Sequence, residues 1–359
     1  MARIVYGVSG EGSGHSSRAS VIAAHLQHRG HDVTIVSYDR GYRNLRERFD
    51  VFETEGLHIS SSDNQVSKRR TIMDNLQRLP QGRRKLKALK AQLFGDNPPT
   101  VVFTDFEPMT AYLANHYDLP LITIDNQHRL RYMTYPCPPE FRSDQVLTEN
   151  IIRAMVPRPD VSLVTTFYFG KTRNDRTFLF PPILRNEVLA LRATQGEHVL
   201  VYLTGGFESF IDQLRGFKRE RFVVYGCGHS GEEGNLLFKA PSRDGFLSDL
   251  ASCKAVMATA GYTLITESLY LRKPYLALPM QGQFEQEINA VFLAQLGYGR
   301  NMRRITPEAI GDFLYRLPEY GARLAAYGAE DNAAILAMVD RLLEDDARLA
   351  QDYHQRRSG

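Results

Sequence analysis

The chain has 359 residues, of which 43% are hydrophobic, 24% charged and 10% aromatic. This composition provides a full apolar core and excludes disordered, collagen-like and coiled-coil chains, and the length predicts two domains. The formal net charge of +3 is too small to indicate a nucleic-acid partner by itself. Three cysteines stand far apart without a C-x-x-C pair, which predicts neither a disulfide framework nor a zinc site and is typical of a cytoplasmic protein: Cys137, Cys227 and Cys253.

Short apolar runs alternate with segments of helical periodicity along most of the chain. In the first half, strands are predicted at residues 4–8, 33–36, 101–104 and 121–124, with a helix over 19–26. The same rhythm restarts with strands predicted at 198–203, 221–225, 255–257 and 275–278. Such alternation predicts two α/β units, each built on a parallel sheet.

A Pro-Pro pair marks the expected boundary between the two sheets. The segment 178–183 contains Pro181 and Pro182, resists a helix and suits an interdomain connection. We therefore expect an N-terminal domain over 1–182 and a C-terminal domain over 183–340. The last segment, 341–359, is expected to be a helix, because apolar residues recur at helical spacing from Ile335 onward. This helix is expected to pack back on the first domain.

A glycine-rich loop follows the first predicted strand, and a predicted helix follows the loop. Glycines at 7, 10, 12 and 14 suit a close approach of backbone N–H groups to an anion, although a plain tight turn explains them equally well. A G-x-G-x-x-G dinucleotide fingerprint starting at Gly10 requires glycine at position 15, which is His15. Asp39 stands where a ribose-binding acid would be expected, so a dehydrogenase stays open as an alternative.

His15 itself is the most informative residue of this loop. Its position at the end of a strand-to-helix loop predicts that it points into the crevice where α/β sheets bind ligands. Histidine titrates near neutrality, which suits a general base, although a lone histidine is more often structural.

The second half carries a complementary pattern. The run Thr259-Ala-Gly-Tyr-Thr-Leu-Ile-Thr-Glu267 leads through a predicted helix to Pro274-Tyr-Leu-Ala-Leu-Pro279 and then to Gln283-Phe-Glu-Gln-Glu-Ile-Asn289. These segments, together with Gly14-His15 and Arg29-Gly-His-Asp-Val-Thr34, resemble the GT-B glycosyltransferases, notably relatives of the peptidoglycan N-acetylglucosaminyltransferase and of UDP-sugar-dependent natural-product transferases. The chain also resembles a less characterised bacterial and archaeal branch, in which Thr104-Asp-Phe-Glu-Pro108 and Asp125-Asn-Gln-His128 recur.

The resemblance implies a GT-B fold, in which two Rossmann-like parallel-sheet domains face each other across a cleft. It also implies that the second domain binds a nucleotide sugar, with UDP as the expected nucleotide and no separate cofactor. Backbone donors at the start of the predicted helix after Gly261 suit a diphosphate without a metal. The implied donor-binding residues are Gly14, Thr204, Gly205, Gly206, Phe246, Gly261, Tyr262, Thr263, Glu267, Gln283, Glu285 and Gln286.

Three of these residues keep alternative interpretations. Glu267 is expected to bind the ribose hydroxyls, with a charge on the helix surface as the alternative. Phe246 stacks on the base or belongs to the core. Glu285 replaces a Gln of the peptidoglycan branch, which leaves the donor sugar undecided.

For catalysis, the resemblance implies that His15 deprotonates the acceptor hydroxyl and that the sugar is transferred with inversion. Asp105, at the end of a first-domain strand, is the expected carboxylate partner that orients the imidazole. Asp105 or Glu107 as the base itself stays open, as does a metal held by this D-x-E pair. We expect metal-independent transfer because the glycine loops of the second half already supply phosphate ligands.

Two basic segments are expected on the acceptor side. Nine Lys and Arg residues lie between Lys68 and Lys90 against one acid, Asp74, which indicates either a solvated face or contact with an anionic glycolipid, acidic polymer or nucleic acid. Leu86, Leu89 and Leu93 interleave with these charges as in a helix that lies on lipid, which allows peripheral contact with the inner face of the membrane. The second segment is expected to line the acceptor site through Asp125, Asn126, His128, Arg129 and Arg131.

Two further function classes remain open at this point. Sugar-nucleotide hydrolases and epimerases of the same fold hold the same donor without transferring the sugar to an acceptor. A binding protein that senses a nucleotide sugar without turnover is the third class. Nothing in the sequence predicts an oligomeric state.

Overall fold

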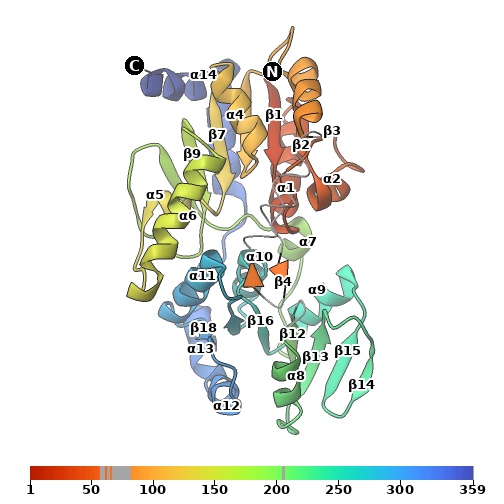
Figure 1. Cartoon of the computed structure of the whole chain (residues 1–359). Coiled ribbons are helices and arrows are strands. Elements are labelled where there is room, and N and C mark those ends of the chain that lie inside the picture. Colours follow the sequence, from red (N-terminus) through yellow and green to blue (C-terminus); the bar gives the residue numbers. More distant parts are fainter. Residues whose placement is uncertain (57–60, 63–64, 67–81, 204–206, 359) are drawn as a thin grey trace. The chain divides into compact units, whose positions relative to one another are not determined.

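A computed structural model describes residues 1–56, 61–62, 65–66, 82–203 and 207–358 of the chain (Figure 1). The chain forms two compact units. The first comprises Met1–Ser60, Ser67–Arg185 and Asp331–Gly359, and the second comprises Ser61–Val66 and Asn186–Glu330. The sequence places these boundaries after residues 182 and 340, whereas the chain passes from one unit to the other after Arg185 and again after Glu330.

The first unit is built on a seven-stranded sheet in which every pairing is parallel. The spatial order is β11-β9-β7-β6-β1-β2-β3. The strands are β1 (Arg3–Val8), β2 (Asp32–Ser37), β3 (Val51–Glu53), β6 (Val101–Asp105), β7 (Leu121–Asp125), β9 (Val161–Thr165) and β11 (Thr177–Phe180). The strands predicted at 4–8, 33–36, 101–104 and 121–124 are confirmed as β1, β2, β6 and β7.

The edge strand β11 corrects one expectation from the sequence. Phe178 to Phe180 were assigned to the interdomain connection, but they pair in parallel with Leu163 to Thr165 of β9. The Pro-Pro pair therefore ends a strand, and the connection begins only after Phe180.

Helices cover both faces of this sheet, which makes the unit doubly wound. On one face, α1 (Gly14–His28) and α14 (Ala333–Ser358) pack on apolar residues of β1, β6, β7 and β9. On the other face, the helical residues 82–93 and α4 (Pro108–His116) pack on Val5, Val102 and Leu121. The remaining elements are α2 (Asp39–Leu45), α5 (Arg129–Tyr132), β8 (Met133–Thr134), a 3-10 turn (Pro139–Phe141), α6 (Arg142–Met155) and β10 (Lys171–Thr172).

The element α14 consists of two helical segments joined at the non-helical residues Glu344 to Ala347, and it brings the C-terminal segment onto the first sheet (Figure 1). Ile335, Val339 and Leu342 are buried in the same core as β1, which matches the helical spacing seen in the sequence. A side-chain contact reinforces this packing, because His25 Nε2 of α1 lies 2.8 Å from Asp340 Oδ1 of α14. Residues 333–340, which the sequence assigned to the second domain, thus belong to the first unit.

The second unit contains another seven-stranded sheet, in the order β14-β15-β13-β12-β16-β17-β18. All pairings are parallel except that of the edge strand β14. The strands are β12 (His198–Tyr202), β13 (Arg221–Tyr225), β14 (Gly231–Glu233), β15 (Leu236–Lys239), β16 (Ala255–Thr259), β17 (Tyr275–Leu278) and β18 (Gly299–Asn301). The four strands predicted in the second half are confirmed as β12, β13, β16 and β17.

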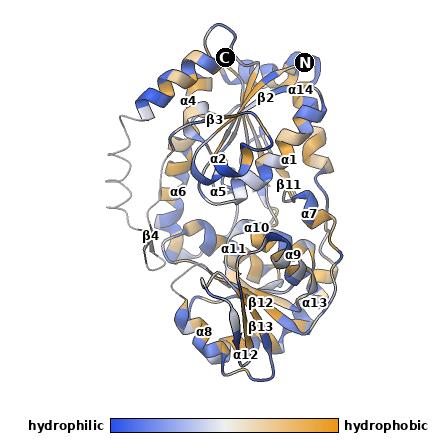
Figure 2. Cartoon of the chain, turned by 90° about the vertical axis from the view of Figure 1, so that its right-hand side faces the viewer, coloured by the Kyte–Doolittle hydropathy of each residue, from blue (hydrophilic) through white to orange (hydrophobic). Residues whose placement is uncertain are grey.

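The helices of the second unit are α7 (Asn186–Leu189), α8 (Glu208–Leu214), α9 (Arg243–Ser252), α10 (Tyr262–Tyr270), α11 (Phe284–Gln295), α12 (Pro307–Tyr315) and α13 (Leu317–Ala325). The same unit includes two short paired strands, β4 (Ser61–Ser62) and β5 (Gln65–Val66). Figure 2 shows hydrophobic residues along the central strands of the sheets and hydrophilic residues on the outer faces of the helices. Among the described helices, none combines the length and the apolar character that crossing a bilayer requires.

Candidate functional site

The first unit joins a histidine and a carboxylate at the carboxyl ends of two adjacent strands. β1 and β6 are hydrogen-bonded neighbours, with Val8 opposite Asp105. The loop after β1 leads into α1, whose second residue is His15, and His15 Nδ1 lies 2.6 Å from Asp105 Oδ1. Asp105 is fully buried and His15 is 9% exposed. Within the described part of the chain, His15 Nε2 has no hydrogen-bond partner, so this nitrogen is available to a ligand.

Arg18 completes this group, and the sequence analysis did not select it. Arg18 lies one helical turn after His15, so both side chains lie on the same face of α1. Its guanidinium donates a hydrogen bond to each oxygen of Asp105, with Nε 3.1 Å from Oδ2 and Nη2 2.8 Å from Oδ1. The same Nη2 lies 3.2 Å from His15 Nδ1. We call these three residues, His15, Arg18 and Asp105, the triad.

Both carboxylate oxygens of Glu107 are occupied by hydrogen bonds from α4. Its carboxylate caps the first turn of α4, where Oε1 accepts from Met109 N and Oε2 accepts from Thr110 N, each at 2.8 Å. Thr110 Oγ1 donates a further hydrogen bond of 2.6 Å to Oε2. Burial raises the pKa of Glu107, and these three hydrogen bonds oppose that rise. Glu107 is thus the N-cap of α4, and its role as a base or metal ligand stays a prediction.

A second histidine–aspartate pair lies at the end of the next strand. Asp125 ends β7, and its two oxygens accept from His128 N at 2.8 Å and His128 Nδ1 at 2.7 Å. Burial favours a raised pKa for Asp125, but the hydrogen bonds and charge of His128 outweigh it and lower that pKa. The pair is fully buried, and the His128 ring stacks on Tyr132 at 5.5 Å with Phe106 edge-on at 6.5 Å. Of the other expected acceptor-side residues, Asn126 and Arg129 are buried and Arg131 is half-buried.

The basic segment is described only from residue 82 onward, so Lys68, Arg69, Arg70 and Arg78 lie outside the described residues. In the helical residues 82–93, three cations are exposed: Arg83, Arg84 and Lys87. The leucines do not face a lipid, because Leu89 and Leu93 are buried in the core against α4 and Leu86 packs at its margin. The interpretation of this helix as lipid-embedded through its leucines is therefore wrong, while its cationic face is open.

In the second unit, Gly261 is the N-cap of α10 and a β-carbon placed there would meet no atom within 4 Å. This leaves space beside the backbone at the start of α10, where the Gly261 N–H itself donates to Thr259 O at 2.8 Å. Two buried side chains hold the preceding loop, since Asn289 Nδ2 donates to Ala260 O at 2.9 Å and the Tyr275 hydroxyl donates to Thr259 O at 2.6 Å. The other expected phosphate turn, Thr204, Gly205 and Gly206, lies outside the described residues.

Three further expected donor-binding residues belong to α10. Tyr262 is its first residue and is buried, and Thr263 follows it at intermediate exposure. Glu267 is only 2% exposed, so the alternative of a solvated surface charge does not hold for it. Tyr262 also helps to raise the pKa of Tyr327, after the larger contribution of burial.

The remaining donor-side residues divide into a linked pair and an aromatic cluster. Gln283 is the N-cap of α11, and its Oε1 accepts from Gln286 Nε2 at 2.7 Å, while Gln286 Oε1 accepts from Met280 N at 3.1 Å. Glu285 beside them is half-buried. Phe246 is half-buried and packs edge-on against Tyr202 and Tyr225, with ring centroids 5.4 and 5.3 Å apart.

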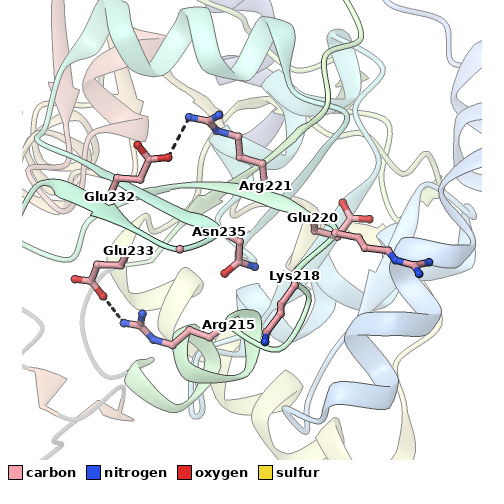
Figure 3. Close-up of a pocket in the computed structure, with 9 residues that line it drawn as sticks. Arg215, Lys218, Glu220, Arg221, Glu232, Glu233 and Asn235 are labelled. Carbon is pink, nitrogen blue, oxygen red and sulfur yellow. Dashed lines mark hydrogen bonds and ion pairs between the residues drawn. The ribbon is translucent and has the colours of Figure 1, made fainter.

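An open pocket of about 740 Å³ occurs elsewhere in the second unit, at the amino ends of β13 and β15 (Figure 3). Its charged side chains pair with each other, Arg221 with Glu232 at 3.6 Å and Arg215 with Glu233 at 2.6 Å. Ligands of parallel α/β sheets bind at the carboxyl ends of the strands, whereas these exposed ion pairs are at the opposite ends. We therefore do not assign this pocket to the donor.

The chain matches the model of glycosyl transferase family 1 over residues 2–318. It is 24% identical over 355 residues to an uncharacterised glycosyltransferase of Methanosarcina mazei, covering 86% of this chain and 87% of that protein. A similar relative from Methanosarcina acetivorans is 24% identical over 340 residues, again covering 86% and 87%. These relatives confirm the resemblance to an archaeal branch of glycosyltransferases.

Solved structures show the same fold at low sequence identity. The kitacinnamycin glycosyltransferase has a TM-score of 0.68 at 17% identity, covering 95% of this chain and 98% of its own. The calicheamicin glycosyltransferase has a TM-score of 0.67 at 16% identity, with coverage of 96% and 99%. A spinosyn rhamnosyltransferase complexed with thymidine diphosphate reaches 0.61 at 14% identity, with coverage of 95% and 99%. The chain therefore belongs to glycosyl transferase family 1, and its two parallel-sheet α/β domains are those of a GT-B glycosyltransferase.

Proposed function

We propose that the protein transfers a sugar from a nucleotide-sugar donor, UDP-linked, to an acceptor hydroxyl, with inversion and without a metal. The observation that carries this proposal is the triad, in which a buried carboxylate holds Nδ1 of His15 and leaves Nε2 available. A histidine held in this way is a suitable base for a hydroxyl group.

In the proposed reaction, His15 Nε2 takes the proton of the acceptor hydroxyl as the oxygen attacks the anomeric carbon. The bond to the diphosphate breaks on the opposite face of the sugar, which inverts the anomeric centre. The leaving diphosphate gains negative charge, and backbone N–H groups at the start of α10 are suited to stabilise it. The open environment of Gly261 supports this assignment, because a phosphate can approach the backbone there.

For the remaining residues we propose the roles that the resemblance implies. Glu267 binds the ribose hydroxyls, and Gln283, Glu285 and Gln286 bind the sugar. Asp125 and His128 contribute to the acceptor side. The acceptor itself is anionic in this proposal, since the helical residues 82–93 carry no acid and expose three cations: Arg83, Arg84 and Lys87.

The proposal is tested with purified protein and a panel of UDP- and dTDP-sugars. Thermal shift identifies the donor, because a ligand that binds the folded state raises the melting temperature. Release of nucleoside diphosphate is then measured with and without acceptor mixtures. The exposed His28, on the same helix, gives the matched control His28→Gln for His15→Gln.

We expect His15→Gln to lower transfer by about 10²- to 10⁴-fold while the donor-induced thermal shift is kept. His28→Gln should behave as the wild type. If nucleoside diphosphate is released equally fast with and without acceptor, the reaction is hydrolysis and not transfer. If no member of the panel binds or reacts, nucleotide sugars are rejected as the donor class. Wild-type activity of His15→Gln would reject the base.

A further inference from the structure

We propose that Arg18 is the positioning residue of the triad, which fixes the plane of the Asp105 carboxylate and thereby the orientation and tautomer of His15. This inference rests on the proposed function, in which His15 Nε2 is the base. It concerns a residue that makes no assigned contact with donor or acceptor.

The geometry of the carboxylate carries the first step. A carboxylate with one hydrogen bond rotates about its Cβ–Cγ bond, whereas a guanidinium that engages both oxygens fixes its plane. Arg18 engages both oxygens of Asp105, at 3.1 and 2.8 Å. Oδ1 is shared with His15 Nδ1 at 2.6 Å, so the fork also fixes which oxygen faces the imidazole.

The contact with Asp105 selects the tautomer of His15. Arg18 carries only donors, so its Nη2, 3.2 Å from Nδ1, would favour a lone pair there, but the contact of Nδ1 with the carboxylate is shorter and decides. A lone pair on Nδ1 would lie 2.6 Å from a carboxylate oxygen, which is a repulsive arrangement. Nδ1 therefore carries the proton and donates to Oδ1, and Nη2 also donates to Oδ1. This leaves the lone pair on Nε2, where the proposed reaction needs it.

Charge balance supports the assignment. Asp105 is fully buried, and a buried charge is stable only when it is paired. Arg18, itself 4% exposed, supplies that charge through its two contacts with the carboxylate. Two further groups feel this charge pair: burial and then Asp105 raise the pKa of Tyr6, and Arg18 adds to the lowering of the pKa of Asp125, after the larger contribution of His128. Arg18 is thus the cation that faces both carboxylates.

The test compares Arg18→Lys with Arg43→Lys, an exposed arginine of α2 that serves as matched control. Lysine keeps the charge but not the fork. We expect Arg18→Lys to lower kcat by about 100-fold, the cost of a small misplacement, while the donor KM and the melting temperature stay near the wild-type values. In Arg18→Ala, millimolar guanidinium chloride should restore part of kcat, whereas sodium chloride at equal concentration should not.

A role limited to stability would give the opposite pattern. Arg18→Lys would then show wild-type kcat, or a loss that follows the melting temperature and is not restored by guanidinium. Either result overturns the inference.

A second readout does not depend on turnover. Nitrogen-15 spectra of histidine-labelled protein report which ring nitrogen carries the proton, and the signal of His15 is identified by its loss in His15→Gln. We expect an Nδ1–H ring in the wild type and a mixture of tautomers in Arg18→Lys. An unchanged tautomer in Arg18→Lys would overturn the positioning role even if no donor in the panel is used, so failure of the proposed function and failure of this inference are distinguished.

Discussion

A β-carbon placed on Gly7 would lie 1.9 Å from Thr110 Oγ1, so β1 and α4 approach as closely as they do only because residue 7 is glycine. The same β-carbon would lie 2.8 Å from Glu107 Oε2, the oxygen that caps α4. Gly7 and the cap thus form one packed contact beside the strand that ends at Asp105. Gly7 is thus required for the packing of β1 against α4.

We expect Gly7→Ala to destabilise the protein by about 1–3 kcal/mol, because the methyl group overpacks a buried contact. Urea unfolding monitored by circular dichroism measures this change. The matched control is Gly321→Ala in α13, where a β-carbon would meet nothing within 4 Å. Alanine should stabilise that helix position by about 0.5–1 kcal/mol. Equal effects of the two substitutions would contradict the packing argument.

Glu107→Ala should affect stability rather than chemistry. The substitution removes an N-cap that makes three hydrogen bonds, so we expect a loss of about 0.5–2 kcal/mol. Donor binding and kcat per folded molecule should stay within about twofold of the wild type, since a change below about 0.4 kcal/mol is of that size. Asp105→Asn is the comparison, because it breaks the triad and should remove most of kcat. A loss of kcat in Glu107→Ala that matches Asp105→Asn would return Glu107 to the catalytic group.

Asn289→Ala tests the glycine loop of the second unit. Asn289 is fully buried and donates to Ala260 O, so its removal leaves that carbonyl without this donor and loosens the start of α10. We expect binding of UDP to weaken by about 1 kcal/mol, or about fivefold in Kd, measured by titration calorimetry.

The control for this substitution is Asn235→Ala. Asn235 donates to Leu214 O and Phe217 O at 2.9 and 3.0 Å, at the amino end of the same sheet. Its loss should lower the melting temperature and leave the Kd for UDP unchanged. A weaker Kd in both variants would indicate a general loss of stability instead of a local effect.

Transfer is expected to continue in excess EDTA. The D-x-E pair is the motif that would hold a metal, but both oxygens of Asp105 bind Arg18 and both oxygens of Glu107 cap α4. A metal would have to displace these donors. Rates are measured with chelator and after addition of Mg²⁺ or Mn²⁺. Complete loss of turnover in EDTA that either ion restores would show that the pair is a metal site.

The sequence predicts the central strands because parallel strands buried on both faces are continuous apolar runs. It fails for β11, where the Pro-Pro pair at 181 and 182 drew residues 178–180 into a connection. For α14 it predicts a helix that returns to the first domain from residue 341, whereas the returning segment begins at Asp331. Long-range packing of this kind has no local signal.

The candidate site divides in the same way. Strand order makes β1 and β6 neighbours, so His15 and Asp105 could be paired from the sequence. Arg18 was missed because a cation on a helix is usually solvated, although its spacing of one turn from His15 was visible. The N-cap of α4 at Glu107 was missed, although its neighbour Pro108 is typical of a first helical turn. Chemistry at strand ends was predictable, and the hydrogen-bond partners of each carboxylate were not.

Asp125→Asn tests the second histidine–aspartate pair through its pH dependence. His128 lowers the pKa of Asp125 despite burial, so the ionised carboxylate stabilises the folded state above the pKa of the unfolded chain, about 3.9. That contribution is lost as pH falls through the lower folded-state pKa. Since removing one partner leaves a buried imidazole without its carboxylate, we expect a loss of about 3–5 kcal/mol at neutral pH. The difference between variant and wild type should then shrink below about pH 4. Urea unfolding at a series of pH values from 7 downward measures the loss at neutral pH and its decrease in acid. The control is Asp32→Asn, because Asp32 is exposed and lies 3.9 Å from Arg3. This control should cost less than about 1 kcal/mol. A constant difference across that range would show that Asp125 stabilises the fold without its charge.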